Sequence, residues 1–186
     1  LFLVLIMHLL KDGGRAAVVL PDGTLFGEGI KTRIKEQLLA TCNLHTVVRL
    51  PNGVFNPYTG IKTNLLFFTK GSPTEDVWFY EHPYPPGYKN YSKTRPMRTE
   101  EFAAEKAWWG GGDRCGRVEN EYAWKVSADD IRARNYNLDC KNPHSPEQAS
   151  HDPDTLLADY ARLQQRIADT RNQLKAALAA ALEGKA

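Results

Sequence analysis

The sequence predicts an α/β fold: parallel strands with a final antiparallel strand, then a small α+β extension and a C-terminal heptad-like helix. Three observations predict this arrangement. Short apolar runs suited to buried strands flank a segment of helical periodicity. A loop without a helix, residues 51–62, leads directly into a further strand, which must therefore reverse direction. Apolar residues at heptad-like spacing fill the end of the chain.

Composition is that of an ordinary globular protein. The chain has 186 residues, is 42% hydrophobic and 25% charged, and has room for one domain with an appendage. Its net charge of +2 is too small to indicate nucleic-acid binding by itself, although residues 31–70 hold six Lys or Arg and one acid. Cys42, Cys115 and Cys140 show neither metal-binding spacing nor a disulfide framework, which predicts a reducing compartment, the cytoplasm.

Residues 1–10, LFLVLIMHLL, form an apolar run that predicts a helix packed on a sheet. The run lacks the basic start of a signal peptide and is too short for a membrane helix. Gly13 and Gly14 follow as a helix stop. Because the run is already under way at Leu1 and no initiator Met precedes it, we expect a fragment of a longer protein.

The next elements predict a βαβ unit. Residues 16–20 form a continuous apolar run, as in a strand buried on both faces, and 21–23 form a turn. A helix to about Ala40 places Ile30, Ile34 and Leu38 on one face and leaves Lys31 and Lys35 outside.

A strand at 47–50 should run parallel to the first strand. After the loop 51–62, a strand at 63–69 should run antiparallel to its predecessor. Residues 1–70 are thus expected to form a partial sheet domain.

Residues 71–140 are expected to form the α+β extension. A strand is expected near 77–80, and Thr99 can cap a helix that ends at Trp108 and Trp109, one of which should pack on the core. The segment 127–130, Ser-Ala-Asp-Asp, resembles a capping box that opens a short helix.

Between them, the Pro-rich loop 83–98 interleaves Tyr with four bases and has no acid: Lys89, Lys93, Arg95 and Arg98. This pattern suits a nucleic-acid surface and equally a loop with solvated charges.

Residues 141–152 form a linker, in which His144 and His151 are expected to be solvated. Asp152 should cap a helix over 153–184 with Pro153 at its first position. Its apolar stripe comprises Leu156, Tyr160, Leu163, Ile167, Leu174 and Leu178. From Asp152 onward the chain has five acids and five bases, so this helix is no basic DNA arm. The stripe could fold back on its own domain or join helices of another subunit.

Four segments carry a family resemblance: GGRAAVVLPDGTLFG (13–27), VVRLPNGVFNPYTGIKTNLLFF (47–68), YAWKVS (122–127) and RNYNLDCKNP (134–143). They resemble the modification (methyltransferase) subunit of type I restriction–modification systems, an adenine-specific DNA methyltransferase family. The resemblance implies that residues 1–70 are the C-terminal half of a Rossmann-like methyltransferase sheet. It also implies methyl transfer from S-adenosylmethionine to the adenine amino group of DNA.

Two motifs of that family are missing here. The catalytic Asn-Pro-Pro-aromatic segment is absent, although Asn56-Pro57 and Asn142-Pro143 occur, and Gly27 and Gly29 do not make a cofactor loop. The resemblance therefore implies a C-terminal part whose S-adenosylmethionine-binding and catalytic residues lie upstream of Leu1. We expect the fragment alone to be inactive, and we assign it no catalytic, cofactor-binding or metal-binding residue.

The resemblance does imply a target-base pocket in this chain. Phe55, in Val54-Phe55, matches the aromatic that stacks on an extruded adenine, although it could instead plug its own loop. Tyr58 is a second wall or a loop support, and Lys62 a DNA contact or a solvated side chain. Asp22 lies near the pocket by resemblance or is a plain turn residue, and we assign it no catalytic role.

Partners implied by the resemblance are DNA and the specificity subunit, which the stripe of residues 153–184 would dock. A second modification subunit and a nuclease subunit are further partners of the family, and no membrane is involved. The rival hypothesis is a noncatalytic module whose only work is helix-mediated assembly.

Overall fold

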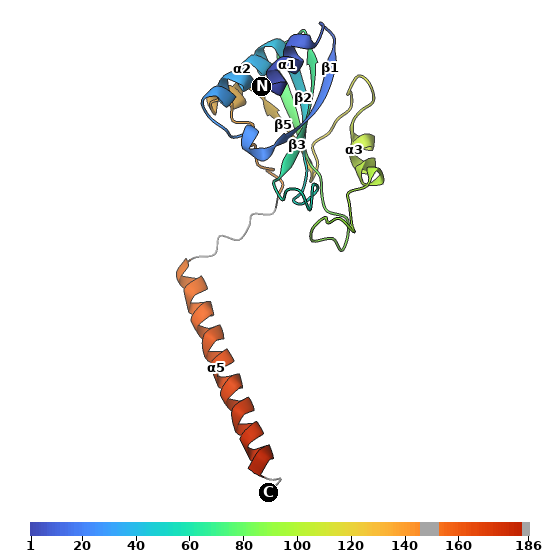
Figure 1. Ribbon diagram of the computed structural model, residues 1–186. Helices are drawn as coiled ribbons and strands as arrows, with labels where there is room; N and C mark the ends of the chain where they lie inside the picture. The colour runs from blue at the N-terminus through green and yellow to red at the C-terminus, as the bar shows by residue number, and fades with distance from the viewer. Residues whose placement is uncertain (146–152, 184–186) are drawn as a thin grey trace. The chain divides into compact units, whose positions relative to one another are not determined.

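The computed structural model describes residues 1–145 and 153–183, which belong to two compact units, Leu1–Ser145 and Pro146–Ala186. The first unit is built on a five-stranded sheet with the order β1-β3-β2-β4-β5 (Figure 1). Its strands are β1 (Arg15–Pro21), β2 (Cys42–Arg49), β3 (Thr63–Lys70), β4 (Asp76–Glu81) and β5 (Ala123–Ser127). Its helices are α1 (Phe2–Leu9), α2 (Ile30–Thr41), α3 (Ala103–Trp108) and α4 (Ala128–Ala133), with 3-10 turns η1 (Asp22–Thr24) and η2 (Thr99–Phe102).

The directions of β1, β2 and β3 agree with the sequence prediction, but the sheet as a whole is mostly antiparallel and its strand neighbours do not follow chain order. β3 is antiparallel to β2, as the helix-free loop predicted. β1 is also antiparallel to β3, so β1 and β2 point the same way with β3 between them. Among the described residues the parallel ladder is β2 with β4, and β5 pairs antiparallel with β4. The segment after residue 70 therefore continues the same sheet.

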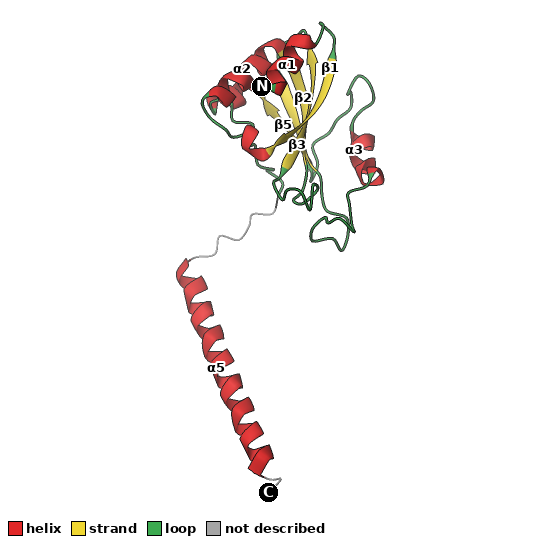
Figure 2. Cartoon of the chain, in the orientation of Figure 1, coloured by secondary structure: helices red, strands yellow, loops and turns green. Residues whose placement is uncertain are grey.

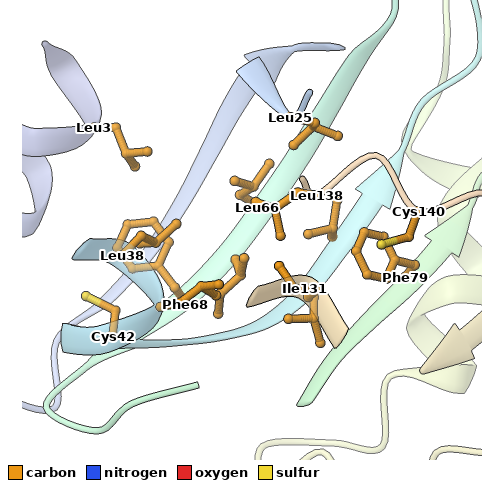
Figure 3. Close-up of a cluster of buried hydrophobic side chains, with 14 of the residues drawn as sticks. Leu3, Leu25, Leu38, Cys42, Leu66, Phe68, Phe79, Ile131, Leu138 and Cys140 are labelled. Atoms are coloured by element: carbon orange, nitrogen blue, oxygen red, sulfur yellow. The ribbon is translucent and has the colours of Figure 1, made fainter. Parts of the chain in front are cut away.

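Helices cover both faces of the sheet (Figure 2). The larger core lies between the sheet and α1, α2 and α4, where apolar side chains from all these elements meet, including Leu3, Leu38, Leu66, Phe68, Phe79 and Ile131 (Figure 3). On the other face, η2 and α3 cover a smaller cluster centred on Val48, Leu50, Tyr80 and Ala123.

Both tryptophans at the end of α3 pack on this second face, where one was expected. The ring centroids of Trp108 and Tyr80 are 5.1 Å apart, and those of Trp109 and Phe67 are 4.9 Å apart. A hydrogen bond between the buried His82 and Glu105 joins α3 to the end of β4.

Three local predictions are wrong. β1 is an edge strand of alternating burial rather than a strand buried on both faces, because β3 is its one described neighbour. Ile30 is exposed, and Lys35 is buried instead of lying outside. The Lys35 ammonium donates to the carbonyls of Leu25 (2.7 Å) and Gly27 (3.0 Å), which explains how a lysine is tolerated there, and burial lowers its pKa.

Helix starts in the extension were predicted with mixed success. Ser127 caps α4 as expected, because its Oγ accepts from the Asp130 amide at 3.0 Å. Thr99 is instead the first residue of η2, and the Arg98 amide donates to the Glu101 carboxylate at 2.8 Å.

All three cysteines are free.

The second unit contains α5 (Pro153–Glu183), close to the predicted range. Its stripe of Leu156, Tyr160, Leu163, Ile167, Leu174 and Leu178 is more than half exposed at every position. Asp152 and His151 lie outside the described residues. No described helix is long and apolar enough to cross a membrane.

Candidate functional site

The loop 51–62 is held at the end of the sheet where β1 and β2 terminate (Figure 1). The Asp22 amide, just after β1, donates to the Lys62 carbonyl at 2.9 Å. At the loop's other end, the Leu50 amide donates to the Thr63 carbonyl at 3.0 Å. Loop 51–62 thus lies at the carboxyl ends of the co-directional strands β1 and β2, the end at which open α/β sheets generally bind ligands.

A charged network anchors this sheet end. Arg49, whose side chain is 16% exposed, lies 2.8 Å from the Asp139 carboxylate and 3.6 Å from that of Asp22. It also donates to the Cys140 carbonyl at 2.9 Å, while the Asn64 side chain donates through Nδ2 to the Asp22 carboxylate at 3.0 Å. A largely buried guanidinium is stable only when it has hydrogen-bond or ionic partners. Here the partners come from turn 22–24 and segment 138–140, so Arg49 joins both segments to β2.

Sequence reasoning missed Arg49, Asn64 and Asp139. The available signal was an arginine inside the apolar segment 47–50, which requires an acid somewhere in the fold. Which acids would meet it depends on segments far apart in the chain. Asp22 takes part in this network through its carboxylate.

The interior of the loop is fixed by its own hydrogen bonds. The amides of Asn56 and Tyr58 donate to the carbonyls of Gly53 (3.0 Å) and Phe55 (2.9 Å). Gly53 has a φ of 78°, a conformation that favours glycine, and a Cβ there would lie 2.1 Å from the Asn90 side chain, which would have to shift. The Asn56–Pro57 peptide is cis.

The two loop aromatics are exposed to solvent, Phe55 in part and Tyr58 almost completely. Val54 packs against the second apolar cluster, whereas its neighbour Phe55 belongs to neither cluster and is 40% exposed. Tyr58 is 92% exposed, and Lys62 is exposed without an ion pair in the described part of the chain. The structure therefore places all three predicted site residues on one surface loop, and Val54 fills the inward position.

Gly27 and Gly29 do not fit a cofactor cradle. A Cβ on Gly27 would lie 2.2 Å from the Lys31 side chain, so the chain itself occupies that space. Gly29, with a φ of 67°, is the N-cap of α2 and eases entry into the helix. In the described ranges, no group of three or more His, Cys, Asp or Glu is arranged to hold a metal ion.

A second polar cluster lies beside β2 on the face covered by α3. Arg117 lies over the rings of Trp108 (4.7 Å) and Trp109 (4.6 Å) and donates to the Thr46 hydroxyl at 2.8 Å. Burial lowers the pKa of Arg117 to about 10. Burial, with Arg114 and Arg117 adding to it, lowers the pKa of His45 to about 3. Since Arg117 is engaged with these side chains, the cluster anchors α3 to the sheet.

The family model for N-6 DNA methylases matches residues 1–152. The chain belongs to the N-6 DNA methylase family. Within this family it is 67% identical to the type I restriction enzyme EcoEI methylase subunit of Escherichia coli, over 99% of this chain and 38% of that protein. The chain thus spans well under half the length of that curated relative.

Two solved structures are similar to this N-6 DNA methylase chain. A modification subunit of a putative type I restriction enzyme from Vibrio vulnificus has 49% identity and a TM-score of 0.72, covering 81% of this chain and 33% of that one. A chain from a study of complex assembly and conformational transition of the type I restriction–modification system has 36% identity and a TM-score of 0.74. Coverage there is 94% of this chain and 38% of that one.

Proposed function

We propose that the chain is the C-terminal part of a type I modification subunit and holds the target adenine during N-6 methylation of DNA. The observation that carries this proposal is the exposed Phe55 on a braced loop at the ligand side of the sheet. Methylation of a base requires its extrusion from the duplex, and the extruded base needs an aromatic platform. The match to N-6 DNA methylases supplies the chemistry.

The strand order supports the assignment of residues 1–70 to half of a Rossmann-like methyltransferase sheet. An antiparallel strand, β3, lies between two strands of one direction, β1 and β2, with α2 connecting those two. β4 and β5, in the proposed extension 71–140, widen this sheet. The range 141–152 would be the linker to the docking helix 153–184, although 146–152 lies outside the described residues.

In the proposed reaction, the chain's own residues position the base. Phe55 stacks on the adenine ring, and Tyr58 stands three residues away as a second wall. The Arg49 network holds the strand from which the loop departs, so the platform is in place before DNA arrives. S-adenosylmethionine would supply the methyl group in the whole subunit. Gly27 and Gly29 form no Gly-rich cofactor loop, so we derive no step through it.

The exposed stripe of α5 favours docking on another subunit over a purely internal role. Six apolar side chains remain more than half exposed on a helix of 31 residues. Burial of each side chain in a complex would contribute roughly 1.5–3 kcal/mol. We assign this surface to the specificity subunit of a cytoplasmic restriction–modification complex. A purely noncatalytic assembly module would use α5 in the same way, but it leaves the exposed Phe55 unexplained.

The test replaces Phe55 in the complete enzyme. Phe55→Ala should slow methylation and weaken target binding, because stacking contributes about 1–3 kcal/mol per base. Phe55→Tyr and Phe55→Trp are the matched controls and should retain most activity. A fluorescent adenine analogue at the target position reports extrusion directly. Wild-type extrusion and methylation in Phe55→Ala would show that Phe55 serves only the packing of its loop.

A further inference from the structure

The loop 83–98 presents unpaired positive charge. It carries four basic residues and no acid, and all four side chains are exposed: Lys89, Lys93, Arg95 and Arg98. None of the four forms an ion pair with another described residue. Such a cluster of cations repels itself and attracts a polyanion.

The loop is nevertheless well braced. Tyr91 is buried at its centre, with its hydroxyl hydrogen-bonded to the Glu101 carboxylate and its ring 5.6 Å from that of Tyr84. Backbone hydrogen bonds between Ser92 and Arg95, at 3.1 and 3.0 Å, form a closed turn. The backbone that carries the cations therefore has a defined path.

This loop is attached to the loop that carries Phe55 (Figure 1). The Tyr84 hydroxyl donates to the Asn52 carbonyl at 2.9 Å, and the Asn56 side chain donates to the Tyr91 carbonyl at 2.9 Å. The Asn90 side chain also lies against Gly53, where a Cβ would be 2.1 Å from its oxygen. Loop 83–98 and loop 51–62, which carries Phe55, thus form one surface.

We propose that loop 83–98 binds the DNA backbone phosphates that flank the adenine placed against Phe55. This inference rests on the proposed function, because it takes the same DNA as the ligand. Lysine ammonium groups and the forked guanidinium of arginine are suited to phosphate oxygens. Phosphate contacts position the duplex without reading its sequence, so the loop fixes how the target enters the pocket.

The test measures the salt dependence of duplex binding by the 186-residue chain. The loop variant replaces Lys89, Lys93, Arg95 and Arg98 with Gln. The control variant replaces four exposed bases elsewhere, Lys11, Arg15, Arg33 and Lys106, with Gln. Both variants change the formal net charge from +2 to −2, because each loses four positive charges. Fluorescence anisotropy with a short labelled DNA duplex gives the binding constant at a series of KCl concentrations.

The loop variant should lower the slope of log K against log salt concentration by about 3 to 4, since each phosphate contact contributes about 0.9. The control variant should change the slope by less than about 1. Circular dichroism establishes that each variant is folded. If the quadruple variant does not fold, Lys93→Gln with Arg95→Gln should lower the slope by about 2.

Equal slopes for the loop and control variants would overturn the proposal, as would the absence of salt-dependent DNA binding by the wild-type chain. Tighter binding of a single-stranded RNA through the same four residues would also overturn it. Phe55→Ala carries no charge change and should leave the slope intact. The two proposals can therefore fail separately. If Phe55→Ala leaves extrusion unchanged but the loop variant lowers the salt slope, the base pocket is refuted and phosphate binding by loop 83–98 stands.

Discussion

Replacing Arg49 with Met tests whether the charged network supports the sheet end. The substitution keeps much of the aliphatic stem and removes the contacts to Asp139 (2.8 Å), Asp22 (3.6 Å) and the Cys140 carbonyl (2.9 Å). Removing one partner of a fully buried ion pair costs about 3–5 kcal/mol. Here the two carboxylates are 30% and 23% exposed, so water replaces part of the interaction. We expect the free energy of unfolding to fall by about 2 kcal/mol.

Urea unfolding followed by tryptophan fluorescence measures this loss. The matched control is Lys125→Met, which removes an ion pair to Asp76 at 3.2 Å whose side chains are 45% and 43% exposed. That change should cost about 0.5 kcal/mol or less. Amide hydrogen exchange should rise in residues 138–142 for Arg49→Met and stay unchanged for the control. An Arg49→Met variant no less stable than Lys125→Met would refute the idea that the network supports this end of the sheet.

Three further predictions concern the cofactor, the docking helix and pH. The isolated chain should not bind S-adenosylmethionine in a calorimetric titration, because it lacks the Gly-rich cofactor loop and the Asn-Pro-Pro segment of the family; micromolar affinity, about −8 kcal/mol, would contradict this. Ile167→Asp with Leu174→Asp should abolish association with the specificity subunit in size-exclusion chromatography, while Asn172→Asp with Gln173→Asp should not. If Ile167→Asp with Leu174→Asp instead unfolds the first unit, α5 is part of a hydrophobic core and the docking hypothesis is wrong.

The pH prediction uses His45, whose folded pKa of about 3 lies below its unfolded value of about 6.5. Between these values the unfolded state binds more protons, so stability falls as pH drops below 6.5. From pH 7 to 5, His45→Gln should lose about 2 kcal/mol less than wild type in urea unfolding. Parallel losses in the two proteins would show that His45 is not the group responsible.

Part of the fold and site could be predicted from the sequence because the signals are local. The helix-free loop 51–62 predicted the reversed β3, and the heptad-like spacing predicted α5 and its exposed stripe. Turn chemistry around Pro57, together with two large aromatics, marked the loop that carries Phe55 and Tyr58. Whether those aromatics face inward or outward was left open, because it depends on whether Val54 or Phe55 fills the cluster beneath.

The sequence by itself determined most element types, the strand directions in the first part of the chain, and the loop that holds the candidate site, but it did not predict strand β5. Those features follow from periodicity and turn residues, which act over a few positions. Tertiary structure alone decided that β3 lies between β1 and β2, that Lys35 is buried against two carbonyls, and that Arg49 meets Asp22 and Asp139. It also decided that loop 83–98 lies against the Phe55 loop. These contacts join residues far apart in the chain, and which of them form depends on how all the buried faces pack together.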